Sequence, residues 1–413
     1  MGGTAEQSVA EMPGVTLRPD LAFFPLDGDL VVFSPVSQTL VALNATAALI
    51  VRKLHEGVAA KAVAAEIARE LNATADEADG WVVAALDSLA AQGLLTGGGP
   101  AAPAPAVPSA REEAVAQRRA KMPPLQAFEP RAEGRYRLLG THALIRYAHR
   151  AQKRMVDAVI GHLGSDEAGE PNLIIDVQAE FPEDGHLSSN IYCDGKPEAQ
   201  AAKLSGLGPQ VKSALWTNAI NAHDFLLDLH AGVVGKEGRC ILLPAAAGSG
   251  KSSLTAALAH KGFGYYSDEV ALIERGSFQV PPVPLAVCVK ETGWDLMSRY
   301  FPELSSLPIH QRDDRKIVRY VPPRAASVQK SPALVSHIFF PLYRKDQPTR
   351  LEPLSRVAAF ARLMDQCLAL RQRLDHGNVQ ELVRWIAGID CYALTFSSLD
   401  EAVACIEGVL AAP

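Results

Sequence analysis

The strongest constraint on the fold is a segment in which an apolar run passes through small residues into a helix-like sequence. Cys240–Pro244 (CILLP) has the pattern of a buried strand, residues 245–252 (AAAGSGKS) follow it, and a helical pattern continues after Ser252. A strand, a glycine-bearing loop and a helix in this order make an anion site, because successive N–H groups and the helix N-terminus point at one place. The segment therefore predicts a nucleotide-binding α/β domain. The alternative is a chance match in a loop rich in small residues.

Two residues of this loop supply chemistry beyond the backbone. Lys251 adds a flexible positive charge suited to the β- and γ-phosphates, and the hydroxyl of Ser252 is suited to holding Mg²⁺. The usual pattern of such loops begins with glycine, whereas this chain has Ala245, so the start of the loop must adopt backbone angles open to alanine. The residues expected to bind the phosphates are Ala245, Ala246, Ala247, Gly248, Ser249, Gly250, Lys251, Ser252 and Ser253.

An acidic pair, Asp268 and Glu269, lies between two predicted strands just beyond the helix. Carboxylates at this point can bind Mg²⁺, directly or through water, or accept a proton from an attacking hydroxyl. A solvated turn is the plainer interpretation. The preceding FGYY is not the aliphatic run of most such sites, which disfavours a GTPase or a transporter-type ATPase. Upstream, His230 can reach toward the phosphates, although an isolated histidine is more often a packed core residue.

The chain divides at a segment rich in proline, alanine and glycine. Residues 97–109 (GGGPAAPAPAVPS) exclude regular structure and suit an extended spacer, and a short charged helix is expected after them. We predict a small module over 1–96, a linker over 97–127 and a large module over 128–413. The large module alternates strands and helices, as an α/β layered domain does. Its strands are expected at 173–177, 240–244, 270–274, 337–343 and 391–396, and its helices at 210–228, 251–261, 354–368, 378–387 and 399–410.

The small module has the outline of a winged helix. Two strand-like runs, at 30–33 and 39–43, predict a hairpin. Three helices are expected after it: Asn44 can cap the first, and Thr74 with Glu77 can form a capping box for the third. DNA binding is disfavoured, because the third helix has no basic residue to meet phosphates. Its charged residues are Asp76, Glu77, Asp79 and Asp87.

Composition narrows the class of protein. Hydrophobic residues make up 48% of the 413 and charged residues 21%, typical of a globular chain of two or three domains. A net charge of −6 does not favour binding to nucleic acid or to an anionic membrane. The six cysteines form no CxxC pair, which is typical of a reducing compartment. No signal peptide is visible, and no apolar run approaches the ~18 residues that span a membrane. We therefore expect a cytoplasmic location.

The order of these pieces resembles a known family. LHAGVV at 229–234, the loop with its helix, and YYSDEVALIE at 265–274 are similar to the catalytic domain of the HPr kinase/phosphorylase family. They look still more like the HPr-kinase-related kinases of bacterial peptide gene clusters, and the similarity continues through VPLAVCVKETGWDLM, RYVPP and the final LDEAVACI. The resemblance implies a fold shared with phosphoenolpyruvate carboxykinases, a P-loop on a mixed, partly parallel sheet. It also implies Mg²⁺-dependent phosphoryl transfer from ATP to a hydroxyl, usually of serine.

The resemblance assigns roles by position. Asp268 matches the acidic residue that acts as base, Glu269 the second acidic residue, and His230 the histidine of the family's LHG segment. With Lys251 these make up the expected catalytic set, and Ser252, Asp268 and Glu269 the expected metal set. Bifunctional members have an acid where this chain has Ser253, which speaks against the reverse phosphorolysis. Basic residues that can join the nucleotide site are Lys290, Arg312, Arg315 and Arg319, although arginine runs are usually solvated faces.

The small module has a resemblance of its own. VVFSPVSQTLVALNATAALIVRKLHEG, followed by AAEIARELN, is similar to the PqqD-like domains that recognise ribosomally made, post-translationally modified peptides. In that family a leader peptide adds a strand to the β-ribbon and packs on a helix. The resemblance places the groove at Thr39–Leu43 and around Trp81–Leu89 of the third helix. A winged helix that binds nothing is the plainer interpretation.

Together the two halves predict a kinase that captures a precursor peptide by its leader and phosphorylates a serine or threonine of the remainder. Two alternatives stay open: a kinase of a small molecule or sugar, and a nucleotide-dependent peptide chaperone or pseudokinase that transfers no phosphate. Kinases of this family are often hexameric, so a homo-oligomer is compatible with the sequence.

Overall fold

The chain folds into two compact units, each with its own hydrophobic core. The computed structural model describes residues 16–96, 110–167, 169–180, 187–246, 248–369 and 374–411. In these ranges no helix combines the length and the hydropathy needed to cross a membrane. The first unit takes in Met1–Val107, Pro353–Asp365 and Leu370–Cys391, and the second takes in Pro108–Glu352, Gln366–Ala369 and Tyr392–Pro413.

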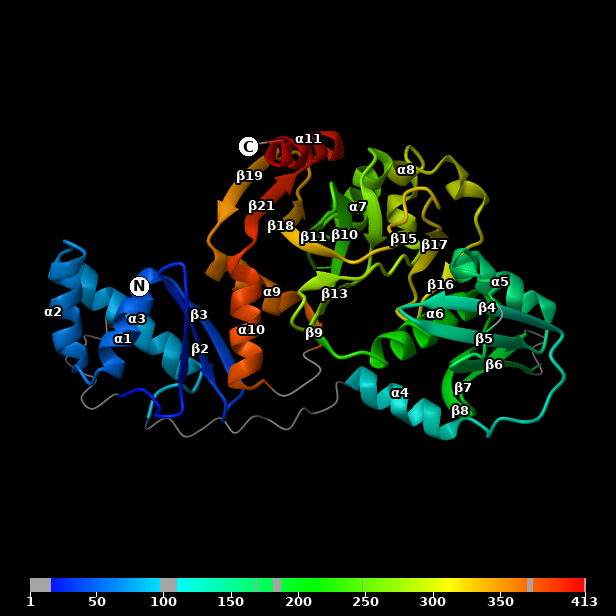
Figure 1. Cartoon of the computed structure of the whole chain (residues 1–413), viewed down its shortest axis with the longest axis horizontal. Coiled ribbons are helices and arrows are strands. Elements are labelled where there is room, and N and C mark those ends of the chain that lie inside the picture. The colour runs from blue at the N-terminus through cyan, green and yellow to red at the C-terminus, as the bar shows by residue number, and fades with distance from the viewer. Residues whose placement is uncertain are drawn as a thin grey trace, which may run out of the picture. The chain divides into compact units, whose positions relative to one another are not determined.

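The first unit is built on an antiparallel three-stranded sheet in the order β1-β2-β3, with a core shared by three helices (Figure 1). The predicted hairpin is β2–β3, and β1 is an additional strand that the sequence did not reveal. Asn44 caps α1 through its side chain, and Thr74 and Glu77 form the predicted capping box of α3. The elements are β1 (Ala22–Leu26), β2 (Asp29–Ser34), β3 (Thr39–Leu43), α1 (Ala45–His55), α2 (Ala60–Glu70) and α3 (Ala75–Ala91).

The second face of this sheet is covered by a helix from far along the chain. Val31 and Phe33 of β2 point away from α1–α3 and are fully buried. On that face α10 (His376–Ala387) packs on β1 and β2, and the ring of its His376 lies 4.7 Å from the ring of Phe24. The preceding α9 (Arg356–Gln366) is tied to the β1–β2 turn, because Arg356 pairs with Asp27 at 2.6 Å. A linear division of the sequence does not anticipate this covering.

The second unit contains a five-stranded sheet in the order β4-β5-β6-β7-β8, in which only β5 and β6 run parallel. Two helices, α5 and α6, share a core with it. The charged helix predicted after the spacer is α4, which lies against β8. The elements are α4 (Ala110–Lys121), β4 (Ala132–Leu138), β5 (Thr141–Tyr147), α5 (Arg150–Ile160), β6 (Leu173–Glu180), β7 (Ser188–Cys193), β8 (Lys196–Ala201) and α6 (Leu204–Asn221).

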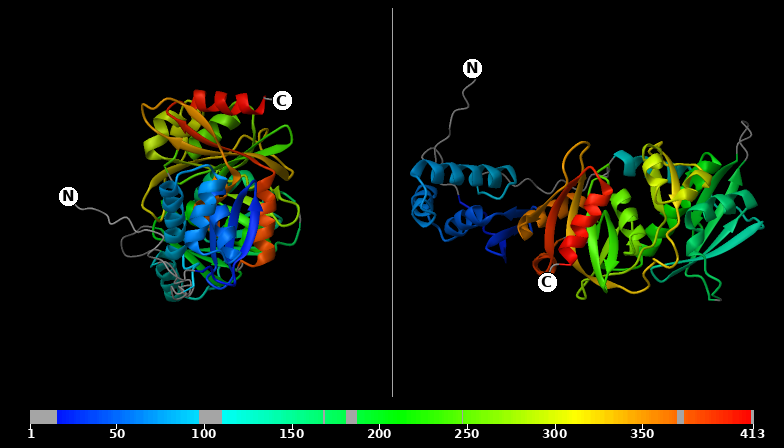
Figure 2. Two further views of the ribbon diagram at one scale, coloured as in Figure 1. Left: turned by 90° about the vertical axis from the view of Figure 1, so that its left-hand side faces the viewer. Right: turned by 90° about the horizontal axis from the view of Figure 1, so that it is seen from above.

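A seven-stranded sheet forms the other half of the second unit, in the order β12-β10-β11-β18-β21-β19, with β14 beside β18. Its central strand β11 has an antiparallel neighbour, β10, and a parallel one, β18. Helices α7 and α11 lie side by side against this sheet (Figure 2). The elements are β10 (Ala231–Lys236), β11 (Arg239–Pro244), α7 (Lys251–His260), β12 (Gly264–Ser267), β14 (Gln279–Val280), β18 (Ala333–Tyr343), β19 (Arg350–Leu354), β21 (Asp390–Phe396) and α11 (Leu399–Leu410).

Two small sheets complete the second unit, β13-β9-β20 and β15-β17-β16. The first leads into His230, and the second carries Lys290 at the end of β15. Their strands are β9 (Phe225–Leu229), β13 (Ala271–Glu274), β20 (Cys367–Ala369), β15 (Val287–Lys290), β16 (His310–Gln311) and β17 (Ile317–Val321). Short helical turns are η2 (Gly161–Leu163), η3 (Glu291–Gly293), α8 (Trp294–Met297) and η4 (Pro302–Ser306).

The five strands predicted for the large module are all present, and the helix predicted at 210–228 is wrong at its end. Phe225–Leu229 form the buried strand β9, between β13 and β20, and the helix α6 begins earlier, at Leu204. A short apolar run fits a strand and a buried helix equally well by its pattern, so the pairing of distant strands decides it. Helix α5 was not predicted. Residues 97–109 of the predicted spacer lie outside the described residues.

Candidate functional site

The loop at 245–252 joins β11 to α7, as the sequence predicts, and two glycines shape it. Gly248 and Gly250 have φ of 92° and 87°, in the left-handed region that glycine enters at little cost. Both the N–H and the hydroxyl of Ser249 donate to the carbonyl of Ala246, at 3.3 and 2.8 Å. Ala247 lies outside the described residues.

Gly250 is also the point of closest contact between the loop and the sheet below it. A Cβ at this position would lie 2.8 Å from Cζ of Phe396 and 3.2 Å from Cβ of Tyr343. The N–H of Tyr343 donates to the carbonyl of Ser249 at 2.9 Å. The absence of a side chain at Gly250 therefore lets the loop sit directly on the ends of β18 and β21.

A second glycine contact holds α7 against β10. A Cβ at Gly232 would lie 2.1 Å from Oγ1 of Thr255, a buried residue of α7. The same hydroxyl donates to the carbonyl of Lys251 at 3.0 Å. Gly232 thus allows α7 to approach closely the strand that follows His230.

Lys251 and Asp268 form a buried ion pair at the N-terminus of α7. Nζ of Lys251 donates to the backbone carbonyl of Asp268 and lies 3.8 Å from its Oδ1. Burial raises the pKa of the Asp268 carboxyl above its usual value, although Lys251 and the Ser252 hydroxyl act against the rise. Among the described residues Oδ1 has no hydrogen-bond partner. A buried carboxyl with a raised pKa and one oxygen to spare is suited to accept a proton.

Glu269 has a different environment from its neighbour. Burial acts to raise the pKa of Glu269, but the charge of Lys212 and the hydrogen bond that Lys212 donates to Oε2 hold it below its usual value. The hydroxyl of Ser267 accepts from the N–H groups of Glu269 and Val270, at 3.2 and 3.1 Å, and so shapes the turn between β12 and β13. Two adjacent acids therefore have pKa values displaced in opposite directions, which separates their chemical roles.

His230 is fixed by the same turn. Its Nδ1 lies 3.0 Å from the backbone carbonyl of Glu269. A carbonyl only accepts, so Nδ1 carries the proton and Nε2 keeps a lone pair. Burial lowers the pKa of His230, and the charge of Lys251 lowers it further. The ring is therefore neutral at neutral pH, with one nitrogen able to accept.

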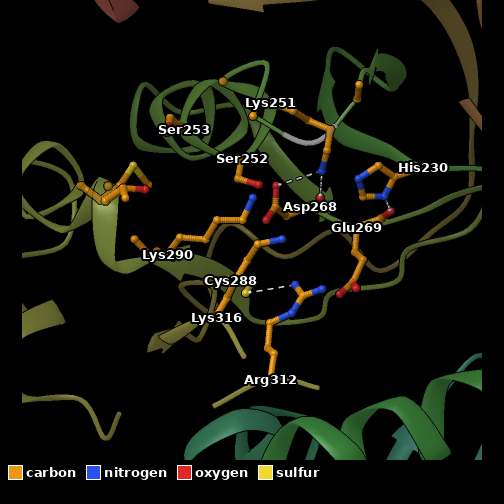
Figure 3. A pocket seen from close by; sticks show the side chains of 17 residues that line it. His230, Lys251, Ser252, Ser253, Asp268, Glu269, Cys288, Lys290, Arg312 and Lys316 are labelled. Atoms are coloured by element: carbon orange, nitrogen blue, oxygen red, sulfur yellow. Dashed lines mark hydrogen bonds and ion pairs between the residues drawn. The ribbon is translucent and has the colours of Figure 1, made fainter. Parts of the chain in front are cut away.

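These groups line one cavity of about 280 Å³ in the second unit. Figure 3 shows Lys290 and Lys316 extending toward Ser252 and Asp268. Arg312 also faces the cavity, and its Nη1 lies 3.7 Å from Sγ of Cys288. Four cations against two carboxylates make the cavity electropositive. Together with the N-terminus of α7, this arrangement suits a polyphosphate.

Most of the predicted site residues meet in this cavity. Lining it are His230, Ala246, Gly248, Gly250, Lys251, Ser252, Ser253, Asp268, Glu269, Lys290 and Arg312. Ala245 and Ser249 are buried residues of the loop and do not line the cavity. Arg315 and Arg319 are also absent from the lining. Arg319 stacks on the ring of Trp294 at 4.4 Å and donates to the carbonyl of Leu304.

Three ionisable residues of the site were missed by sequence reasoning, together with Val289, Thr292, Gly293 and Met297, which also line the cavity. Cys288 and Lys316 line the cavity, and Lys212 reaches Glu269 from α6. Lys212 is only 5% exposed, and its Nζ lies 5.5 Å from the centre of the Tyr320 ring. A single lysine in the apolar helix α6 was the one available signal, since lysine is almost never buried without a partner.

The oxygens of Ser252 and Asp268 are the protein groups that fit Mg²⁺ best. The Ser252 hydroxyl lies against the Asp268 carboxylate, which also has an oxygen without a hydrogen-bond donor. Glu269 is engaged by Lys212. Within the described ranges no three His, Cys, Asp or Glu side chains form a metal cluster. Mg²⁺ at nucleotide sites needs few protein ligands, because phosphates and waters supply the rest.

The first unit offers an open sheet edge. β3 lies at the edge of its sheet and, among the described strands, pairs only with β2. Trp81 of α3 is 38% exposed, while Val82, Leu86 and Leu89 of the same helix are buried in the core. An unpaired edge and an exposed indole are features that bind peptides.

Comparison with known proteins identifies the first unit more firmly than the second. Residues 29–95 match the family "Coenzyme PQQ synthesis protein D (PqqD)". They form a PqqD-like domain. No curated protein matches the chain. Among solved structures, the Hpr(Ser) kinase/phosphatase from Coxiella burnetii is similar at 15% identity over 44% of this chain and 93% of that one, with a TM-score of 0.22. A TM-score this low supports no conclusion about the second unit, so its function has to be inferred from the geometry of the site.

Proposed function

We propose that the protein is an ATP- and Mg²⁺-dependent kinase that phosphorylates a serine or threonine hydroxyl of a ribosomally made peptide. The observation that carries this proposal is the Lys251–Asp268 pair, which lies at the N-terminus of α7 in an electropositive cavity. A phosphate-binding loop with an adjacent base is the minimum that phosphoryl transfer to a hydroxyl requires.

The chemistry of the cavity fits a nucleoside triphosphate with its metal. The N–H groups of the loop, Lys251 and the nearby Lys290, Arg312 and Lys316 would hold the phosphates. Ser252 and Asp268 would hold Mg²⁺, which when bound neutralises charge on the phosphates. Lys251 would exchange its bond to the Asp268 carbonyl for one to a phosphate oxygen, since both are acceptors for the same ammonium.

Asp268 is the residue proposed to accept the proton. As the hydroxyl oxygen of the acceptor forms its bond to the γ-phosphorus, the bond from that phosphorus to the β–γ bridging oxygen breaks and the diphosphate leaves. The proton of the hydroxyl passes to the carboxylate of Asp268. His230, neutral and with Nε2 open, would align the acceptor or a water beside it. Positioning and electrostatics supply most of the catalysis, because a loose transition state needs little covalent help.

The first unit is proposed to bind the leader of the peptide. A peptide strand added along β3 would satisfy the open edge, and an apolar residue of the leader would pack on Trp81. Capture at one unit raises the effective concentration of the hydroxyl at the other. The PqqD match of residues 29–95 supports this step.

Mass spectrometry of a precursor peptide encoded beside the gene, after incubation with ATP and Mg²⁺, tests the proposal. We expect the peptide to gain phosphate with the wild-type protein. The Asp268→Asn variant should transfer 10²–10⁴-fold more slowly, roughly what loss of a general base costs. It should still bind Mg·ATP, because the amide oxygen of asparagine can replace the carboxylate as a ligand of Mg²⁺. Lys251→Ala should weaken Mg·ATP binding itself.

Two results would contradict the proposal. Peptide and nucleotide binding without any gain of phosphate, unchanged by Asp268→Asn, would indicate a nucleotide-dependent chaperone. Phosphorylation of small alcohols at the same rate with and without the peptide would indicate a small-molecule kinase.

A further inference from the structure

The two flanks of the loop differ in character. In the sheet order β12-β10-β11-β18, the loop follows β11, Asp268 follows β12, and β18 lies on the opposite side of β11. Figure 1 shows β10, β11 and β18 side by side. The flank toward β12 holds the charged cavity. The flank toward β18 ends in an exposed aromatic residue, Tyr343. Because β18 runs parallel to β11, its carboxyl end reaches the same edge of the sheet as the loop, where ligands of open α/β sheets bind.

Tyr343 is held against the loop and against Phe396 of β21. Its N–H donates to the carbonyl of Ser249 at 2.9 Å, and its Cβ lies where a Cβ of Gly250 would be only 3.2 Å away. Its ring meets the ring of Phe396 edge to face, with the centres 5.9 Å apart and the planes at 70°. The side chain is nevertheless 43% exposed. Isolated exposed aromatics are common, but this one is held in position against the residues that would bind phosphate.

We propose that Tyr343 is the stacking platform for the base of the bound nucleotide. This inference rests on the proposed kinase function and extends it. With the terminal phosphate facing Asp268, the proposal places the nucleoside on the other flank of the loop, where Tyr343 lies. Arg344 and Lys345, both exposed, follow directly in the chain. An aromatic face beside cationic side chains is the combination that binds a base together with its phosphates.

Calorimetry on the full-length protein, with Mg·ATP and with Mg·tripolyphosphate as a donor that lacks base and sugar, separates the two parts of the site. The Tyr343→Ala variant should bind Mg·ATP about tenfold more weakly, because stacking on one base contributes of that order. It should bind Mg·tripolyphosphate like the wild type. Tyr343→Phe keeps the ring and should keep the affinity for ATP. Leu342→Ala is the matched control: Leu342 is 41% exposed on the other face of the same strand, and its loss should change neither affinity.

Four outcomes would overturn the inference. If Tyr343→Ala weakens the binding of ATP and of tripolyphosphate equally, the residue supports the loop and does not stack on the base. No change in either affinity would exclude stacking. If the wild-type protein binds ATP no more tightly than tripolyphosphate, there is no subsite for the base, although the phosphate site remains. Wild-type protein that binds neither would overturn the proposed function as well.

Discussion

The PqqD-like unit and the loop site of the second unit are assembled in opposite ways. The residues lining the cavity come from one continuous part of the chain, 230–316. One face of the sheet in the first unit is covered by the segment directly after it, and the other face is covered by α10, more than half the chain away. A site made of neighbouring segments is visible as a sequence motif. A core completed by a distant segment is not.

The two regions also differ in what holds them together. The first unit depends on apolar burial on both faces of β2, where Leu30 and Val32 face α1–α3 and Val31 and Phe33 face the other way. The loop site instead concentrates buried charge, with Lys212 against Glu269 and Lys251 against Asp268. The stability that apolar burial contributes does not depend on pH, whereas the stability that a buried ion pair contributes does. The two regions should therefore respond differently to a change of pH.

The largest effect is expected from Phe33→Ala in the first unit. It should lower the free energy of unfolding by about 3–5 kcal/mol, the usual cost of emptying a fully buried phenylalanine site. Phe23→Ala on the neighbouring strand removes the same side chain from a half-buried position and should cost less. Denaturant titration followed by circular dichroism measures both. A small loss of stability for Phe33→Ala would show that the face of the sheet covered by α10 contributes little to the stability of the first unit.

Next in size, Gly250→Ala should damage the loop far more than Gly248→Ala. Both residues have positive φ, so each substitution costs about 1–2 kcal/mol of backbone strain. Only at Gly250 does the new methyl group also meet Phe396 and Tyr343, whereas nothing lies within 4 Å of a Cβ at Gly248. A displacement of about 1 Å should reduce the transfer rate roughly 10²-fold. Steady-state kinetics of the two variants would show whether the contact with Phe396 and Tyr343 or the positive φ is responsible for the loss of activity.

Lys212→Met should destabilise the second unit in a pH-dependent way, by about 1–3 kcal/mol at neutral pH, since part of Glu269 is exposed. Glu269 has its pKa lowered in the folded state, so its pair with Lys212 contributes stability above the usual value of 4.5 and loses it as pH falls through the lowered pKa. The gap in melting temperature between wild type and variant should therefore close below about pH 4.5.

Matched variants separate charge from packing at this position. Lys212→Arg keeps the charge and should recover most of the loss, and the double variant Lys212→Met with Glu269→Gln removes the unpaired carboxylate. Phe33→Ala, by comparison, should show a gap that does not depend on pH. A pH-independent gap for Lys212→Met would mean that the lysine acts by packing on Tyr320 alone.

The last effect concerns the open edge of the first unit and is of similar size to that of Lys212→Met. Trp81→Ala should weaken binding of the leader peptide by about 2 kcal/mol, or roughly thirtyfold, as truncation of an interface tryptophan often does. Leu71→Ala, exposed to a similar degree at the end of α2, is the control and should bind normally. Fluorescence anisotropy of a labelled leader measures both. Equal effects from the two variants would place the peptide elsewhere on the unit.

Local features of the chain were predictable because their causes lie within a few residues. The strand, loop and helix around Gly248 and Gly250 follow from the need for positive φ and a helix N-terminus, and the caps at Asn44 and Thr74 follow from hydrogen bonds to the next turn. The match of residues 29–95 to PqqD supports the domain expected from sequence. By contrast, Phe225–Leu229 was misassigned, since its partners β13 and β20 are distant in sequence.

The sequence by itself determined the strand, loop and helix around residues 248–252, since backbone geometry within a few residues places Lys251 and Ser252 at the N-terminus of α7. The approach of Asp268 to Lys251 depends on the pairing of β12 with β10 and therefore belongs to the tertiary structure. Only the tertiary structure decided that Lys212 neutralises Glu269, that Lys316 and Cys288 join the cavity, and that α10 closes the PqqD-like sheet. The physical reason is the sequence separation between the residues that interact. Hydrogen bonds within a turn are fixed by adjacent residues, whereas the partner of a buried charge or an apolar face is whichever distant segment buries it best.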